Sequence, residues 1–122
     1  MTTDLQNYAG EDFCYLTTTG RVTGRPHTIE IWFAIDQRTL YMLSEKATNA
    51  DWVKNLMRKP EVTVRIKDTV FSGQGRVVED ADEDARARRV IVDKYQPTYS
   101  QDLTEWGRSG LMVAVDLVGV KG

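Results

Sequence analysis

The feature that most restricts the fold is a glycine-containing turn between two strand-like runs near the start of the chain. The run Phe13–Thr19 enters this turn, and an alternating run from Thr28 to Ile35 follows Pro26. Gly20 and Gly24 can take positive φ without steric cost, so the backbone can reverse tightly between the two runs. The pattern therefore predicts an antiparallel β-hairpin.

Two arginines, Arg21 and Arg25, bracket the same turn. Their guanidinium groups carry a fixed positive charge and forked donors, and the glycines let backbone amides point toward a common centre. Such a turn suits a bound anion, for example the phosphate of a cofactor. The segment by itself fits an ordinary hairpin with solvated arginines equally well.

Composition predicts one globular domain over residues 1–122, because 41% of the residues are hydrophobic and 28% are charged. The formal net charge of −2 gives no global electrostatic case for a nucleic-acid partner. No run approaches the roughly 18 apolar residues that a membrane span needs. Met1–Gly10 lacks a basic start and an apolar centre, so we expect no signal peptide, and the single cysteine fits a cytoplasmic location.

The residue inventory argues against catalysis by side chains. One histidine and one cysteine are too few for a zinc site built from those residues. Cys14 falls in an apolar strand pattern, which predicts a buried small hydrophobe rather than a nucleophile paired with His27. No nucleophile-elbow pattern surrounds Ser44, which argues against a serine hydrolase. We therefore predict no catalytic side chain and no metal, and a bound cofactor would supply the chemistry.

Hydrophobic periodicity predicts a mainly β fold with helices, of the α+β class. Six strands are expected, at residues 12–19, 27–35, 39–44, 61–66, 69–78 and 110–118. One helix, capped by Thr48 or Asn49, should end before Pro60, and a second should cover residues 82–95. Residues 1–11 should form a polar helix or arm, and residues 96–109 an irregular segment. The order favours a small antiparallel barrel with helices at its edges or openings.

Two local patterns predict close packing. Four apolar residues recur at helical spacing and should form a stripe on the first helix, namely Trp52, Val53, Leu56 and Met57. Gly73 and Gly75 share one face of a predicted strand. Glycines in this arrangement indicate a bend, or the close approach of another backbone or a ligand.

A second candidate anion site lies where the third predicted strand meets the first helix. Free amides at a helix N-terminus attract phosphate, Lys46 adds a charge, and Ser44 and Thr48 add hydroxyl donors. The alternative is a capped helix start beside a solvated lysine. Asp51 would repel an anion close to these amides, so we assign it to capping of the helix.

Three further residues are candidates for ligand contact. His27 could donate to a cofactor phosphate or carbonyl, or could be an exposed residue at the start of a strand. Tyr99 and Trp106 lie in the irregular segment, and we predict that they line the substrate side of the site. Their alternative role is packing in the core or at an interface.

These elements form an ordered set of short motifs along about half of the chain, from Tyr15 to Val78. The motifs are Thr18-Thr19-Gly20-Arg21, Gly24-Arg25-Pro26, Ser44-Glu45-Lys46, Asp51-Trp52, Asn55-Leu56 and Pro60-Glu61-Val62-Thr63-Val64. The set resembles the flavin and deazaflavin split-barrel oxidoreductases. It looks closest to the deazaflavin (F420)-dependent nitroreductase and quinone reductase branch, which is related to the pyridoxamine 5'-phosphate oxidase-like FMN-binding proteins.

The resemblance implies a six-stranded antiparallel split β-barrel of the FMN-binding type and a homodimer with the cofactor in a groove at its interface. It further implies hydride transfer, most simply from reduced F420, to a small electron-poor acceptor such as a quinone, enone or nitro compound. The turn from Gly20 to Arg25 would approach the cofactor, Ser44 and Lys46 with the following loop would hold its phosphate, and Trp52 would pack beside its ring or tail.

Two positions depart from the branch. Val22 and His27 stand where it usually carries basic residues that help to hold the anionic tail. These departures leave an FMN-dependent oxidoreductase as an alternative. A non-enzymatic flavin- or haem-binding carrier or sensor would use the same groove.

Overall fold

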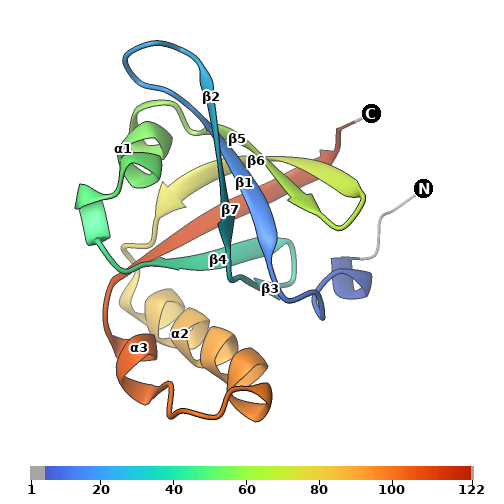
Figure 1. The fold of residues 1–122 in the computed structure, drawn as a ribbon, viewed down its shortest axis with the longest axis vertical. Helices are drawn as coiled ribbons and strands as arrows, with labels where there is room; N and C mark the ends of the chain where they lie inside the picture. Colours follow the sequence, from blue (N-terminus) through green and yellow to red (C-terminus); the bar gives the residue numbers. More distant parts are fainter. Residues whose placement is uncertain (1–4, 122) are drawn as a thin grey trace.

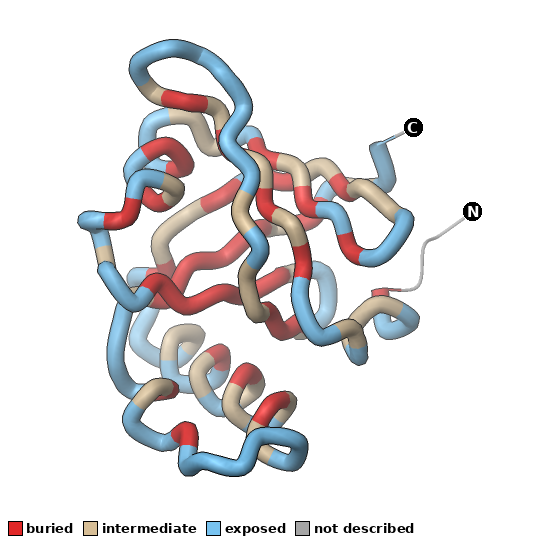
Figure 2. Tube along the Cα trace, in the orientation of Figure 1, coloured by how far each residue is buried: buried red, intermediate tan, exposed pale blue. Residues whose placement is uncertain are grey.

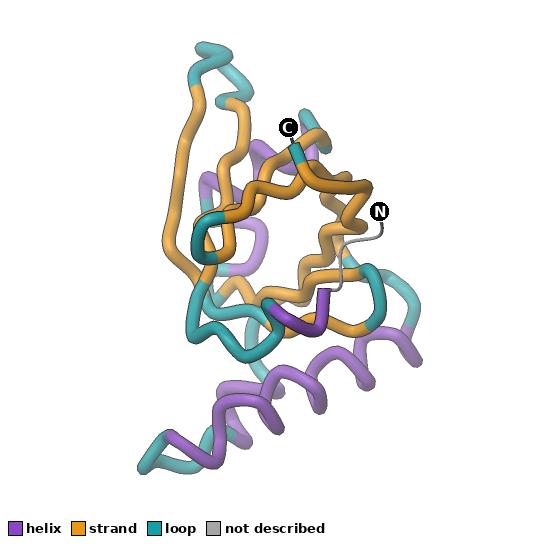
Figure 3. The backbone as a smooth tube through the Cα atoms, turned by 90° about the vertical axis from the view of Figure 1, so that its right-hand side faces the viewer, coloured by secondary structure: helices purple, strands orange, loops and turns teal. Residues whose placement is uncertain are grey.

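The computed structural model describes residues 5–121, in which seven antiparallel strands form one sheet that curls into a half-barrel (Figure 1). Neighbouring strands follow the order β2-β1-β5-β6-β7-β4-β3. The β1–β2 hairpin projects beyond the ring of the other strands (Figure 3). The strands are β1 (Cys14–Thr19), β2 (Pro26–Ile31), β3 (Ala34–Asp36), β4 (Thr39–Ser44), β5 (Glu61–Ile66), β6 (Thr69–Val77) and β7 (Leu111–Val120).

The helices are α1 (Asp51–Arg58), α2 (Ala81–Tyr95) and α3 (Thr104–Arg108), with short 3-10 turns η1 (Leu5–Asn7), η2 (Ala47–Asn49) and η3 (Gln96–Thr98). Helices α2 and α3 lie together beneath the sheet, and α1 lies near the base of the projecting hairpin (Figure 1). The polar arm expected at residues 1–11 falls partly outside the described residues, and its described part includes η1. None of the helices formed by residues 5–121 is long and apolar enough to cross a membrane.

Two helix predictions need correction. The N-cap of α1 is Ala50, without a side-chain hydrogen bond, because the expected caps Thr48 and Asn49 are used in η2. Helix α3 occupies part of the segment expected to be irregular, and its five residues are too few to show a helical period. The stripe on α1 is also narrower than expected, since Met57 is 56% exposed.

The prediction of six strands was wrong, because the run expected at residues 27–35 divides into β2 and β3. Strand β2 pairs with β1, and β3 pairs with β4. At the break, the hydroxyl of Tyr95 accepts from the amide of Phe33 at 2.9 Å and lies 2.7 Å from the carbonyl oxygen of Asp12. The Nζ of Lys94 donates to the Phe33 carbonyl at 2.9 Å. Side chains of α2 thus satisfy the backbone where the strand leaves one partner for the next.

The apolar residues form two layers, one inside the half-barrel and one between its outer surface and α2. Val53 and Leu56 bring α1 into the inner layer, and Ile91 brings α2 into the outer one. Figure 2 shows the buried course of β4 and β7 between them. Cys14 is fully buried in the inner layer, as predicted, and burial raises the pKa of its thiol to about 12.

Gly73 and Gly75 mark close approach, one of the outcomes their spacing predicted. A Cβ atom on Gly75 would collide with the side chain of Leu56 on α1, and one on Gly73 would collide with Val115 on β7. The amide of Gly75 also donates to the carbonyl of Pro60 at 2.7 Å. The absence of a side chain at Gly75 therefore lets α1 lie directly against β6, and its absence at Gly73 leaves room for Val115 of β7.

Candidate functional site

A groove of about 850 Å³ opens where the half-barrel is not closed. Strand β2 pairs only with β1, and β4 beyond Tyr41 pairs only with β7, so each strand presents a free edge. The lining comes from both edges and from the segments beside them: residues 29–32, 43–46, 50–52, 99, 101–103 and 106. Edge strands carry backbone donors and acceptors without strand partners, so this groove offers polar backbone as well as side chains to a ligand.

Five of the predicted site residues line this groove, namely Ser44, Lys46, Trp52, Tyr99 and Trp106. The remaining five do not, namely Arg21, Gly24, Arg25, His27 and Thr48. The hairpin residues among them lie on the projecting β1–β2 hairpin (Figure 3). In that turn Gly24 takes the expected positive φ of 76°. Gly20 does not have a positive φ, and its role is close packing against the carbonyl of Arg25 and the ring of His27.

Arg21 folds back from the hairpin onto α1. Its Nη1 donates to the Oδ1 of Asn55 at 2.8 Å, and the same oxygen accepts from the Arg21 amide at 3.2 Å. Its Nη2 forms an ion pair with Asp51, which lines the groove, at 3.4 Å. Arg21 therefore anchors the hairpin to α1 and neutralises one carboxylate at the groove wall.

The loop between β4 and α1 holds two polar side chains, of which one is hydrogen-bonded within the loop and the other is exposed to the groove. Ser44 is buried, and its Oγ donates to the carbonyl of Ala47 at 2.8 Å, which closes the turn. Lys46 is exposed in the groove lining. Because Ala50 cannot cap α1 with its side chain, the first amides of that helix have no side-chain acceptor.

An aromatic cluster forms the wall on the α3 side of the groove. The ring of Trp32 stacks on Tyr95 at a centroid distance of 4.1 Å, and it meets Tyr99 and Trp106 edge to face at 5.5 Å. The sequence does not single out Trp32, because alternation only places it on one face of a strand. The sequence pattern does not reveal that the strand breaks after Ile31, and this break lets α2 and α3 pack around Trp32.

The charged residues in the lining are mostly acidic. Four carboxylates, Glu30, Glu45, Asp51 and Asp102, accompany the ammonium group of Lys46. Sequence reasoning assigned roles to Lys46 and Asp51, and it gave none to Glu45, although this residue is part of the Ser44-Glu45-Lys46 motif. It missed Glu30 and Asp102, since isolated acidic residues on a strand or loop carry no motif.

Two of these carboxylates have neutral hydrogen-bond partners. The hydroxyl of Tyr15 donates to Glu30 at 3.1 Å, which raises the pKa of Tyr15. The amide and hydroxyl of Thr104 donate to Asp102 at 2.9 and 2.5 Å, and these bonds lower the pKa of Asp102. Asp102 therefore remains a carboxylate at neutral pH.

A half-barrel with an aromatic groove between two free edges has the split-barrel-like form that the resemblance implied. The family model described as F420H(2)-dependent quinone reductase matches residues 2–117. The chain belongs to this family. It is an oxidoreductase, and its cofactor is F420.

Solved structures share the fold at low sequence identity. An F420-H2-dependent reductase has a TM-score of 0.67 and 21% identity, over 85% of this chain and 93% of that one. A protein provisionally assigned as a 5-nitroimidazole antibiotic resistance protein from Bacteroides thetaiotaomicron has a TM-score of 0.76 and 17% identity, over 98% and 82%. A structure described as a domain-swapped dimer has a TM-score of 0.69 and 20% identity, over 85% and 79%.

The groove fits the two chemical parts of F420, a flat deazaflavin ring and an anionic tail that carries a phosphate. Its volume suits a ligand of this size, and Trp52 and the aromatic cluster offer apolar faces to a ring. The uncapped start of α1 and the adjacent Lys46 offer amide donors and a positive charge to a phosphate. The donor set of this chain is thus compatible with the cofactor of its family.

Proposed function

We propose that this chain reduces a small electron-poor acceptor, such as a quinone, enone or nitro compound, in the groove between β2 and β4. The observation that carries the proposal is the presence in one groove of an uncapped helix start with a lysine and of an aromatic wall. When bound, reduced F420 supplies the hydride. The chain's own residues bind and orient the two partners and limit the access of water.

We assign phosphate binding to Lys46 and the first amides of α1, with Trp52 beside the cofactor ring or its tail. Ser44 contributes through the turn that it closes, which holds Lys46 in the lining. Arg21 acts by neutralising Asp51, which would otherwise repel an anion at the start of α1.

The exposed hairpin residues Gly24, Arg25 and His27, together with Thr48, are proposed to meet the outer part of the anionic tail. Tyr99 and Trp106 are proposed to face the acceptor, because they belong to the aromatic wall.

The test is a titration of F420 by its fluorescence on purified protein. Replacing Lys46 with alanine should weaken binding by about ten- to a hundredfold, since a charge-assisted contact to phosphate is worth roughly 1.5–3 kcal/mol. Arg21→Ala should also weaken binding, because it leaves Asp51 unpaired. The matched control is Lys54→Ala, which removes an exposed charge of α1 outside the groove lining. Equal, small effects from all three variants would refute this assignment.

We also propose that the protein forms a homodimer. Val118 and Val120 expose 68% and 48% of their surface on β7, beside a second hollow of about 540 Å³ that contains Thr63 and Lys121. A second copy would cover these apolar side chains. Light scattering at micromolar concentration should report about twice 13.9 kDa, and a stable monomer would contradict the proposal.

A further inference from the structure

The aromatic wall and the carboxylates beside it point to a rule of substrate choice. We propose that the groove accepts flat, uncharged or cationic aromatic acceptors and rejects anionic ones, and that Glu30 and Asp102 impose this selection. The inference rests on the proposed function, because it concerns the acceptor that the groove receives. It adds a charge requirement to the electron-poor character of that acceptor.

The first step of the argument is the position of the two carboxylates relative to the wall. Glu30 on β2 lies two residues before Trp32, and both residues line the groove. Asp102 lies between Tyr99 and Trp106, whose rings both contact Trp32. The two acidic residues therefore flank one aromatic cluster, although they come from opposite ends of the sequence.

The second step is the lack of compensating charge. Within residues 5–121, neither Glu30 nor Asp102 belongs to an ion pair. Arg65 lies over the ring of Tyr15 at 4.3 Å, and Arg108 contributes to the electrostatic environment of Asp102. Both cations lie outside the groove lining, so they weaken the negative potential there without replacing it.

The third step is the contrast with the start of α1. There the acidic Asp51 is paired with Arg21, and Lys46 stands next to Glu45 in the lining, so the positive and negative charges balance. An anionic cofactor tail is therefore more strongly disfavoured along the aromatic wall than on this side. The same charge pattern that selects the acceptor thus also fixes the direction in which the cofactor binds.

The expected size of the effect follows from charge repulsion in a partly solvated groove. A carboxylate roughly 7 Å from a bound anion should lower its affinity by about three- to tenfold, and added salt should reduce that penalty. Two carboxylates should therefore discriminate against a sulfonated acceptor by about tenfold or more.

The experiment compares menadione with a naphthoquinone sulfonate as acceptors for the enzyme saturated with reduced F420. The quantity is the ratio of kcat/KM for the neutral quinone to kcat/KM for the sulfonate, measured in wild type, Glu30→Gln, Asp102→Asn and the double variant. Comparing variants cancels the intrinsic reactivity of the two quinones. Glutamine and asparagine can still accept the hydrogen bonds from Tyr15 and Thr104, so the local structure is kept. Glu105→Gln is the matched control, since Glu105 lies on α3 outside the lining.

We expect the ratio to fall by about tenfold in the double variant, through a gain with the sulfonate, and to stay within twofold in Glu105→Gln. A second readout avoids catalysis: quenching of tryptophan fluorescence by each quinone in the complex with oxidised F420. A ratio that is the same in every variant would overturn the proposal. If neither quinone is reduced but the quenching titrations show the charge preference, the reaction proposed above fails and the charge selection stands.

Discussion

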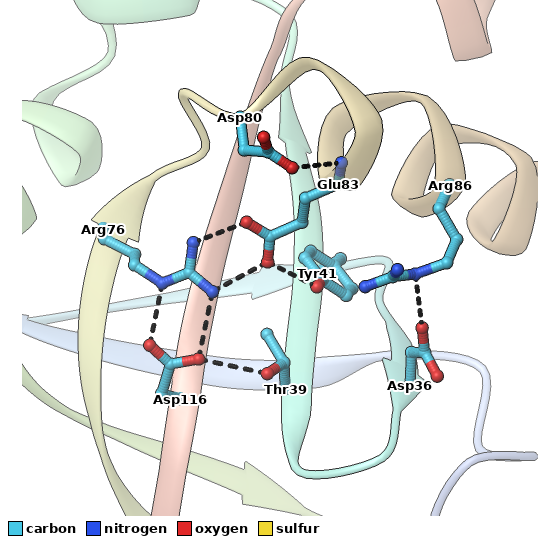
Figure 4. Close-up of polar contacts among 8 residues, drawn as sticks. All are labelled: Asp36, Thr39, Tyr41, Arg76, Asp80, Glu83, Arg86 and Asp116. Carbon is cyan, nitrogen blue, oxygen red and sulfur yellow. Dashed lines mark hydrogen bonds and ion pairs between the residues drawn. The ribbon is translucent and has the colours of Figure 1, made fainter.

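Two regions of this molecule hold carboxylates in opposite ways. Where α2 meets the sheet, Arg76 lies between Glu83 and Asp116, with four hydrogen bonds of 2.7–3.1 Å (Figure 4). In the groove, Glu30 and Asp102 face a cavity without an opposing guanidinium. The difference indicates that the first region uses its charges to join elements, whereas the second keeps charge available to a ligand.

Neutral donors also bind the two carboxylates of this junction, the contact between α2 and the sheet that Arg76, Glu83 and Asp116 form. Tyr41 donates to Glu83 at 2.6 Å, and Thr39 donates to Asp116 at 3.0 Å. The hydrogen bonds from Arg76 lower the pKa of Glu83 to about 2 and also lower that of Asp116. Among residues 5–121, Glu30 and Asp102 accept hydrogen bonds from neutral donors but belong to no ion pair, which is the contrast that the following predictions test.

Removing the central charge of the junction should have the largest effect on stability. Arg76→Met leaves Glu83 and Asp116 facing each other without a cation, and we expect a loss of about 2–3 kcal/mol in the free energy of unfolding. Urea denaturation followed by circular dichroism measures it. Arg86→Met is the control, because the ion pair of Arg86 with Asp36 is more exposed and should contribute under about 1 kcal/mol. Similar losses in both variants would remove the distinction between a closed junction and an ordinary surface pair.

Acid should open the same junction. The folded-state pKa of Glu83 is lowered from 4.5 to about 2, so its contribution is complete above pH 4.5 and is lost as the pH falls toward 2. We expect about 2 kcal/mol to disappear across this window, after allowance for the partial exposure of Arg76. Glu83→Gln should be less stable at pH 7 and should show a flatter dependence on pH. An unchanged slope in that variant would assign the acid sensitivity to other carboxylates.

The link between the two regions is Tyr95, which belongs to α2 and supports Trp32. Tyr95→Phe leaves the buried amide of Phe33 without its acceptor, at an expected cost of about 1–2 kcal/mol. Because the strand break then loses its fixed geometry, KM for the acceptor should rise while the Kd of F420 stays unchanged. Tyr8→Phe is the control, since its hydroxyl contacts Thr69 away from the groove. If Tyr95→Phe alters stability alone, Tyr95 supports the fold without positioning the wall.

The smallest effect is expected at the tip of the hairpin. Val22 is 88% exposed, so Val22→Lys should change stability by less than about 0.5 kcal/mol. If the tail of F420 extends along the hairpin, the added charge should tighten its binding by about threefold. Ala85→Lys provides an exposed control on α2, outside the groove lining. Equal affinity in both variants would confine the tail to Lys46 and the start of α1.

Most of the β-structure follows from alternation, as in β5, where Val62, Val64 and Ile66 are buried on one face. The division of one predicted strand at Trp32–Phe33 does not follow, because its cause is a pair of side chains about 60 residues away on α2. Local patterns carry no information about such contacts.

The acidic start of α2 shows the same limit. Its acidic residues match the helix dipole, and that match alone indicates no further role for them. In the fold Asp80 caps the helix at the amide of Glu83, and Glu83 itself binds Arg76 on β6. In the site, Lys46 and Trp52 were predictable from a strand–loop–helix motif, whereas Glu30 and Asp102 acquire a role only when distant segments enclose one groove.

The hydrogen atom that Gly75 carries in place of a side chain has a consequence for the shape of the groove. Leu56 occupies the space where a Cβ would stand, so α1 seats directly on the sheet and carries Trp52 and its first amides at a set depth. The width of the groove therefore depends on how closely α1 packs against β6. A methyl group at Gly75 would press on Leu56, which does not line the groove, and would shift the end of α1 that does, so a substitution at this position offers a way to change the width of the groove.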